Sequence, residues 1–262
     1  MHNIRVISRL DIKGPNVIKG VHLECLRIVG DPEALATKYY GDGADEIIYI
    51  DIVASLYGRN NLTEIVKGAS KHIFVPLITG GGIRSLEDIN KLLHAGADKV
   101  AINSWLIKKP HFIDKAVKSF GSQCIVGSIE AKNIKEGKWQ AFYYNGREFS
   151  GKDAIAWATE LVDRGVGELL VTSIDKEGTK KGYDCELIKK ISNIVCVPVI
   201  ASGGAGNLQD IEKVINEGKA DAVAVASLIH YNILSIRDIK KHLHDLKSIS
   251  EKTHHNNENI CD

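Results

Sequence analysis

The sequence predicts an α/β protein, a (β/α)8 barrel (TIM barrel) made of two repeated half-barrels, from three observations. Short apolar runs alternate with helix-like segments along the chain, which is typical of parallel βα units. The length of 262 residues, 44% of them hydrophobic, is the usual size of one such barrel. The stretch PLITGGGIR at 76–84 returns as PVIASGGAG at 198–206, an offset of 122 residues (198 − 76) that indicates two-fold internal repetition.

The first half of the chain contains clear signals for where its helices begin. Asp31 followed by Pro32 combines an N-cap residue with a proline in the first helical turn. Ser85 with Asp88 three residues later is a variant of the capping box. Gly14-Pro15 and Gly20 make 13–27 a long loop. We expect strands at 4–11, 46–52, 74–79 and 99–103, and helices from 31, at 61–70, 85–95 and 110–120.

The second half repeats this order, and the segment GVGELLVTS near 165 corresponds to GADEIIYID near 43. This correspondence favours the barrel over an open doubly wound sheet, which is the structural alternative. Residues 1–247 form the predicted barrel, and the polar segment 248–262 is predicted to be a disordered tail. We expect strands at 123–130, 168–173, 197–201 and 222–226, a loop through 139–147, and helices at 153–164, 186–192, 208–217 and 236–246.

Composition excludes several classes of protein. The net charge of +1 (34 basic minus 33 acidic residues) provides no overall field for nucleic acid or membrane surfaces. Five scattered cysteines without a CxxC pair argue against a disulfide scaffold and a zinc site, and for a reducing cytoplasm. The chain has no signal-peptide pattern and no long apolar run. We therefore expect a cytoplasmic protein that binds neither nucleic acid nor membrane and needs no metal or cofactor.

The repeated glycine stretch predicts two phosphate sites. A strand that ends in glycines and is followed by a helix start presents backbone N–H groups to an anion. The alternative is that these glycines only allow the chain to turn, but two matched copies favour a ligand with two phosphate ends. The first site is expected at Gly81, Gly82, Asn103 and Ser104, and the second at Gly203, Gly204 and Ser227.

Two carboxylates end matching strands of the two halves. Asp11 ends the first strand and Glu130 the fifth, so they are expected to face each other across the barrel mouth and to share acid–base work. The alternative is that both are only polar strand-end residues. Lys19, in the first long loop, is placed to act as an electrostatic clamp. Further strand-end residues suited to hydrogen-bonding a polyhydroxylated ligand are Asp51, Asn103, Thr172, Ser173, Asp175 and Ser202.

Four charged residues begin strands at the opposite end of the barrel: Arg5, Glu46, Lys99 and Glu168. Charges that point into a narrow barrel have to pair, so a closed ring of salt bridges is expected. The ring is either a plug that seals the barrel or a gate that admits a small polar molecule.

The sequence resembles the cyclase subunit of imidazole glycerol phosphate synthase across about residues 1–245, through LDIKGPNVIKG, GGGIRSLEDINKLLHAGADKVAIN, TSIDKEGTKKGYD and VIASGGAGN. The resemblance implies a phosphoribulosyl formimino aminoimidazole carboxamide ribotide as substrate, and ammonia from a separate glutaminase on the strand N-terminal face. Asp11 matches the family's catalytic aspartate, and Glu177 and Gly178 lie in its substrate-binding loop. Arg5, Glu46, Lys99 and Glu168 match its ammonia gate, and Asp98 matches a glutaminase-interface residue.

The departures from the family pattern cluster at the chemistry. Glu130 replaces the second catalytic aspartate, and Glu177 replaces an aspartate of the DRDGTKDGYD loop. Arg9 replaces a cysteine; strand alternation points it the same way as Asp11, which it would hold ionised. One added methylene displaces the Glu130 carboxyl by about 1 Å, which can cost ~100-fold in rate.

Three functions follow from the resemblance and its departures. The first is a cyclase that converts the two-phosphate substrate and ammonia into imidazole glycerol phosphate and aminoimidazole carboxamide ribotide in histidine biosynthesis. The second is an ammonia conduit between a glutaminase and a sugar amidotransferase of surface-polysaccharide synthesis. The third is the related single-chain phosphoribosyl sugar isomerase, which the complete set of gate residues disfavours.

Overall fold

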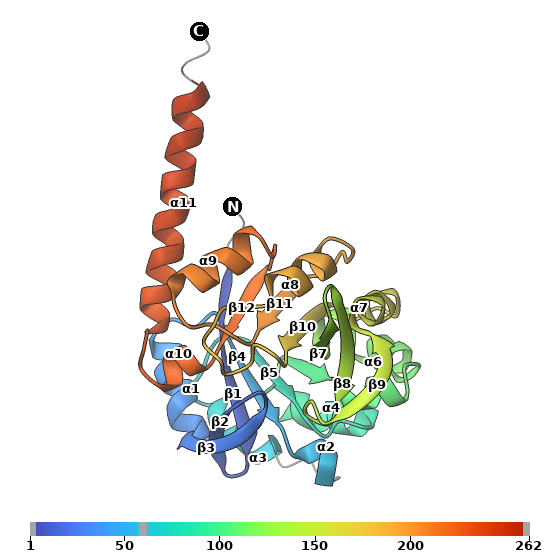
Figure 1. Cartoon of the computed structure of the whole chain (residues 1–262). Helices are drawn as coiled ribbons and strands as arrows, with labels where there is room; N and C mark the ends of the chain where they lie inside the picture. The colour runs from blue at the N-terminus through green and yellow to red at the C-terminus, as the bar shows by residue number, and fades with distance from the viewer. Residues whose placement is uncertain (1–3, 58–61, 259–262) are drawn as a thin grey trace.

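A closed parallel barrel forms the centre of the computed structural model, which describes residues 4–57 and 62–258 (Figure 1). Within these residues its strands are β1 (Arg5–Lys13), β4 (Glu46–Asp51), β5 (Leu77–Gly80), β6 (Lys99–Ile102), β7 (Ile125–Lys135), β10 (Glu168–Ser173), β11 (Val199–Ser202) and β12 (Ala222–Val225). They neighbour one another in that order, β12 pairs with β1, and every one of these pairings is parallel. The predicted eight-stranded barrel is confirmed.

Helices follow the strands and cover the outside of the barrel. Asp31 and Asp153 are the N-caps of α1 and α7, and Ser85 and Asn207 form capping boxes at α4 and α9. Asp31 and Asp153 are 122 residues apart (153 − 31), and so are Ser85 and Asn207 (207 − 85). The internal repeat therefore includes the positions at which these helices begin. Residue 61, the expected start of one helix, lies outside the described residues. The long helices are α1 (Pro32–Gly41), α3 (Leu62–Ala69), α4 (Leu86–His94), α6 (Phe112–Phe120), α7 (Ala154–Asp163), α8 (Cys185–Ser192), α9 (Leu208–Asn216) and α11 (Ile236–Glu258).

Side chains alternate along each strand between two apolar layers. Val6 and Leu10 of β1 belong to the layer between barrel and helices, whereas Ile7 belongs to the barrel interior. The interior layer is filled by Ile7, Ile48, Ile78, Ala101, Val126, Leu170, Ile200, Ala222 and Ala224. On β1 this alternation turns three charged side chains inward. Arg5 lies below the apolar layer, and Arg9 and Asp11 lie above it.

Two hairpins replace the loops expected at 13–27 and 139–147, so these two predictions were wrong. The first consists of β2 (Asn16–Val21) and β3 (Glu24–Gly30), and the second of β8 (Lys138–Tyr143) and β9 (Glu148–Asp153). β1 and β7 extend beyond the barrel and pair with β2 and β8 antiparallel, which satisfies backbone groups that a loop would expose. Because the first strand of each half carries such a hairpin, the hairpins also follow the two-fold repeat.

The last element of the described residues is α11, which projects from the barrel as the long red helix of Figure 1. We expected disorder from residue 248, but the helix continues to Glu258. No glycine or proline occurs after Gly218 to interrupt it. Residues 259–262 lie outside the described part. None of the helices in that part has the length and apolar character needed to cross a membrane.

Short helices that the sequence analysis did not predict follow three of the barrel strands. They are α2 (Ala54–Tyr57) after β4, α5 (Ser104–Lys108) after β6 and α10 (Ser227–His230) after β12; a 3-10 turn, η1 (Ser122–Cys124), precedes β7. The first three lie at the carboxyl ends of the strands, where they shape the candidate site.

Candidate functional site

Asp11 and Glu130 both lie at the carboxyl ends of barrel strands. β1 and β7 are four strands apart in either direction around the ring, so their residues face each other across the mouth. Asp11 is 6% exposed, and Glu130 is close enough for its pKa to respond to the charges of Asp11 and Arg9. The predicted opposition of the two carboxyl groups is therefore present in the structure.

Arg9 crosses the mouth above the apolar layer of the barrel. Its Nε donates to Asp11 Oδ1 at 2.9 Å, and its Nη1 donates to Thr172 Oγ1 at 2.8 Å and Ser202 Oγ at 2.9 Å. Only 6% of Arg9 is exposed. Two residues expected to bind substrate hydroxyls, Thr172 and Ser202, thus hold this guanidinium group in the described structure.

The two carboxyl groups differ in their tendency to hold a proton. Burial alone would raise the pKa of Asp11, but the charges of Arg9 and Lys19 hold that pKa below its ordinary value. Burial raises the pKa of Glu130 to about 7, although the Gly146 N–H, which donates to Glu130 Oε2 at 2.7 Å, acts in the opposite direction. At neutral pH Asp11 is a carboxylate, and Glu130 is divided between its two protonation states.

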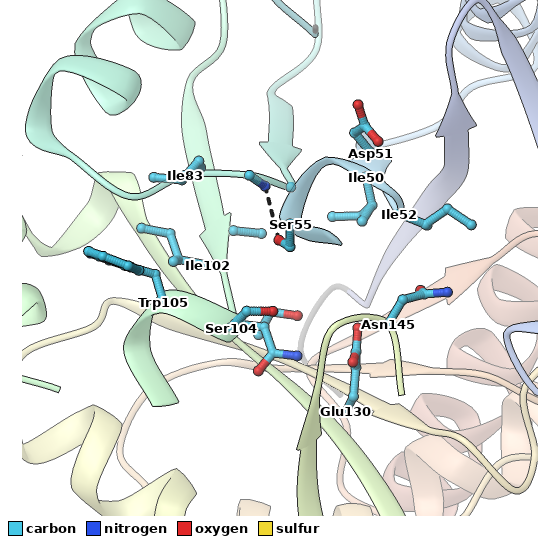
Figure 2. A pocket seen from close by; sticks show the side chains of 15 residues that line it. Ile50, Asp51, Ile52, Ser55, Ile83, Ile102, Ser104, Trp105, Glu130 and Asn145 are labelled. Atoms are coloured by element: carbon cyan, nitrogen blue, oxygen red, sulfur yellow. Dashed lines mark hydrogen bonds between the residues drawn. The ribbon is translucent and has the colours of Figure 1, made fainter. Parts of the chain in front are cut away.

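We call the two predicted phosphate sites the first glycine cradle (Gly81 and Gly82) and the second glycine cradle (Gly203 and Gly204). The first cradle lies beside Glu130 and lines a cavity of about 40 Å³ (Figure 2). Gly81 has φ +107°, and a Cβ there would stand 2.3 Å from the carbonyl oxygen of Asp51, so this position requires glycine. The Gly82 N–H donates to Ser55 Oγ at 3.2 Å, drawn as the dashed line in Figure 2. The figure also shows Glu130 and Asn145 on one side of the cavity, with Asp51 and Ser55 toward the other.

Polar residues of the first cradle are tied to neighbouring backbone. Asn103 Nδ2 donates to the Phe142 carbonyl at 3.1 Å, and its buried Oδ1 has no partner among the described residues. Ser104 Oγ accepts from the Tyr144 N–H at 3.0 Å. Asp51 Oδ1 accepts from two N–H groups at the start of α2, at 3.0 and 2.9 Å. The structure thus places all three at the cavity and connects it to the β8–β9 hairpin.

The second glycine cradle lines a smaller cavity, of about 20 Å³, on the other side of the mouth. Gly203 has φ +92°, and a Cβ there would meet the Ser173 carbonyl oxygen at 2.9 Å. Asp175 does not line this cavity; its Oδ2 accepts from the Asn133 N–H at 2.7 Å. The predicted residues that do line it are Lys19, Glu177, Gly178, Ser202, Gly203, Gly204 and Ser227, joined by Arg9.

The tip of the β2–β3 hairpin contacts Glu177, one of the residues that line this second cavity. Lys19 and Glu177 form a buried ion pair, and Glu177 Oε2 also accepts from the Leu23 N–H at 3.2 Å. The His22 N–H donates to the Glu177 carbonyl at 2.9 Å, and Asn145 Nδ2 donates to the Leu23 carbonyl at 3.3 Å. A ligand larger than a few water molecules therefore requires residues that line this cavity to move.

The four strand-start charges form a closed ring, as predicted. Arg5 contacts Glu46 and Glu168 at 2.6 Å each, and Lys99 contacts the same two residues at 3.2 and 2.9 Å. The glutamates are nearly buried, whereas the side chains of Arg5 and Lys99 are 26% and 21% exposed. The ring thus separates the apolar barrel interior from solvent at the strand N-terminal face.

Asp98 lies exposed on the same face, immediately before β6. Its Oδ2 accepts from the Leu77 N–H at 2.8 Å. Asp45 and Asp221 precede β4 and β12 and accept in the same way from Val6 and Val199, each at 2.8 Å. Asp98 therefore has a structural role shared by three strand starts.

Within the described ranges, no group of three or more His, Cys, Asp or Glu side chains is arranged to hold a metal ion. The described cysteines, 25, 124, 185 and 196, are free thiols.

The sequence analysis missed two serines and an asparagine that line the first cavity: Ser55, Ser128 and Asn145. Asn145-Gly146 between two β-rich runs is a turn signature that could have predicted the β8–β9 hairpin and hence the position of Asn145. Ser55 depends on the short helix α2, and Asp51, which accepts from the N–H groups at the start of that helix, was the available signal. Ser128 is two residues before Glu130 and so shares its inward face, a signal available from strand alternation.

Comparison with known proteins agrees with the resemblance. A family model described as "Histidine biosynthesis protein" matches residues 5–235. The imidazole glycerol phosphate synthase subunit HisF of Legionella pneumophila is 57% identical over 210 residues, 80% of this chain and 99% of that protein. The HisF subunits of Endomicrobium trichonymphae and Alkaliphilus metalliredigens (strain QYMF) are 48% and 46% identical, over 93% and 92% of this chain and 93% and 96% of their own lengths.

These relatives support the first of the three expected functions and give no support to the conduit or the isomerase. The match extends over both halves of the barrel and includes both glycine cradles and both carboxyl positions. The chain therefore belongs to the histidine biosynthesis protein family, within the group of imidazole glycerol phosphate synthase subunits HisF.

Proposed function

We propose that this chain is a lyase, the cyclase that uses ammonia and the two-phosphate ribulosyl substrate to make imidazole glycerol phosphate and aminoimidazole carboxamide ribotide. The observation that carries the proposal is the pair Asp11 and Glu130, opposed across a mouth that has a glycine cradle on each side. A substrate with a phosphate at each end would span the two cradles, which would place its centre between the carboxyl groups.

The protonation states of the carboxyl groups suit this reaction. Ammonia loses protons as its nitrogen bonds to the substrate, and the aminoimidazole nitrogen gains one as it leaves. Asp11, a carboxylate at neutral pH, is suited to accept a proton, and Glu130, with a pKa of about 7, is suited to donate one. Lys19 adds positive charge beside the second cradle once its ion pair with Glu177 rearranges.

The ammonia would come from a separate glutaminase docked on the strand N-terminal face in the cytoplasm. The matched relatives are themselves named as subunits of a synthase. The ring of Arg5, Glu46, Lys99 and Glu168 lies on this face and would act as the gate, because ion pairs open to solvent on one side can exchange partners. Exposed Asp98 would contact the glutaminase in addition to supporting β5.

The test is steady-state cyclisation of the synthetic ribulosyl substrate with an ammonium salt and no glutaminase present. The unmodified protein should form imidazole glycerol phosphate, and Asp11→Asn should lower turnover by ~100-fold or more. Asp163→Asn is the matched control, since Asp163 is exposed at the end of α7, and it should retain activity. No product from the folded, unmodified protein would refute the proposed function.

A further inference from the structure

Arg9 connects three strands across the barrel mouth. It starts on β1, and its Nη1 reaches Thr172 on β10 and Ser202 on β11, at 2.8 and 2.9 Å. Its Nε pairs with Asp11 at 2.9 Å. Three of the five guanidinium donors are therefore used, in different directions, and the planar group cannot turn without breaking hydrogen bonds. Arg9 fixes the position of the Asp11 carboxylate as well as its charge.

The groups that face Asp11 come from three elements. Arg9 contacts it from β1, Lys19 acts on it from β2, and His230 acts on it from α10. Burial lowers the pKa of His230 to about 4, so this ring is neutral at physiological pH. Lys19 is shared with Glu177, with which it forms an ion pair. Arg9 is therefore the cation in direct contact with Asp11 among the described residues.

Glu130 is faced by a different set of groups. The Gly146 N–H donates to it at 2.7 Å, and the Asn103 side chain lies beside it. Arg9 and Asp11 act on it from across the mouth through their charges. Among the described residues no lysine or arginine is in ion-pair contact with Glu130, unlike Asp11. The two carboxyl groups are therefore unequal because Arg9 is bonded to only one of them.

We propose that Arg9 is a positioning residue that divides the acid–base work of the mouth: it holds Asp11 in place as the proton acceptor and leaves Glu130 to carry the proton. The use of this proton in cyclisation rests on the proposed function. The pairing itself, and the resulting protonation states, do not.

The experiment titrates the two carboxyl groups directly, in full-length protein carrying ¹³C-labelled aspartate and glutamate side chains. Asp11→Asn and Glu130→Gln assign the two resonances. Arg9→Met should raise the titration midpoint of Asp11 by about 1 to 3 pH units and shift that of Glu130 by less. Arg9→Lys, which retains the charge without the planar fork, should restore part of the difference. Arg27→Met, the same change at an exposed arginine, should shift neither midpoint.

A second readout is the pH profile of cyclisation. The acidic limb of kcat/KM should move to higher pH in Arg9→Met and return toward its original position in Arg9→Lys. If Arg9→Met does not fold, Arg9→Gln removes the same charge from a polar side chain and carries the same expectation. An unshifted Asp11 midpoint in either folded variant would overturn the proposal, even if thermal stability fell. Absence of cyclisation in unmodified protein would refute the proposed function alone, because the NMR titration would still decide the role of Arg9.

Discussion

Glu130→Gln removes one titratable proton from the mouth and almost nothing else. Glutamine has nearly the size and shape of glutamate, and its side-chain oxygen can still accept from the Gly146 N–H. In the unmodified protein burial raises the pKa of Glu130 from its ordinary value of 4.5 to about 7. The substitution therefore tests both the raised pKa and the use of the proton.

The magnitude follows from linkage between proton binding and folding. A rise from 4.5 to about 7 corresponds to at most about 3 kcal/mol, at 1.36 kcal/mol per pH unit. Because the pKa is raised, the folded state binds the proton more tightly than the unfolded state does. This stabilisation is complete below pH 4.5 and is lost as the pH rises through 7. Relative to Glu130→Gln, the unmodified protein should lose about 2–3 kcal/mol of unfolding free energy between pH 5 and pH 8.

The assays are urea unfolding of both proteins at pH 5 and pH 8, and ammonium-dependent cyclisation across the same range. Glu130→Gln should lower turnover by ~100-fold, and the limb of the pH profile near neutrality should disappear. Glu136→Gln is the matched control, because Glu136 is exposed in the turn between β7 and β8. Its stability difference from the unmodified protein should not depend on pH.

Two results would contradict this reasoning separately. A difference in unfolding free energy between unmodified protein and Glu130→Gln that is the same at both pH values would mean that the pKa of Glu130 is not raised. A pH-dependent difference with undiminished turnover would confirm the raised pKa and sink the assignment of Glu130 as an acid or base.

Three further predictions concern other parts of the chain. Lys99→Met should lower the free energy of unfolding by about 1–3 kcal/mol, because it leaves Glu46 and Glu168 short of a partner. It should also change glutamine-dependent turnover with the glutaminase more than ammonium-dependent turnover. Equal effects on both would make the ring purely structural. Gly81→Ala should abolish phosphate binding at the first cradle, measured by calorimetry, because its Cβ would collide with the Asp51 carbonyl oxygen; unchanged binding would exclude this cradle. Truncation after residue 247 should change unfolding free energy by less than about 0.5 kcal/mol and leave cyclisation unchanged; a larger loss would assign the end of α11 to the folded domain.

The barrel was predictable because its signals are local and repeated. The glycine stretches, the capping pairs Ser85 with Asp88 and Asn207 with Asp210, and the regular spacing of apolar runs each indicate the same unit. The two hairpins were not predicted, because β2 and β3 depend on pairing with the extension of β1, which is a tertiary interaction. The glycines and proline of 13–20 resemble loop signals when this pairing is not known.

The site was predictable in position but less so in its contacts. The positions of Asp11, Glu130 and both glycine cradles could be predicted from the ends of the expected strands, because the carboxyl ends of parallel strands meet at one face of a barrel. The sequence could not show that Thr172 and Ser202 would bind Arg9, since those contacts join strands more than 160 residues away in the chain (172 − 9; 202 − 9). The sequence likewise could not show that the Asp175 side chain would accept from the Asn133 N–H and line neither cavity.

The two-fold repeat explains why the carboxyl groups are opposed, and its breakdown explains why they differ. Asp11 and Glu130 occupy matching positions 119 residues apart (130 − 11), and by the same offset Arg9 corresponds to Ser128 (128 − 9). A symmetric barrel with like groups at both places would have left two carboxyl groups of similar pKa. Because the halves carry arginine in one place and serine in the other, one carboxyl is held ionised and the other is left to exchange a proton near neutral pH. Arginine in one half and serine in the other, together with Lys19 beside Asp11, give the repeated scaffold a direction for proton transfer.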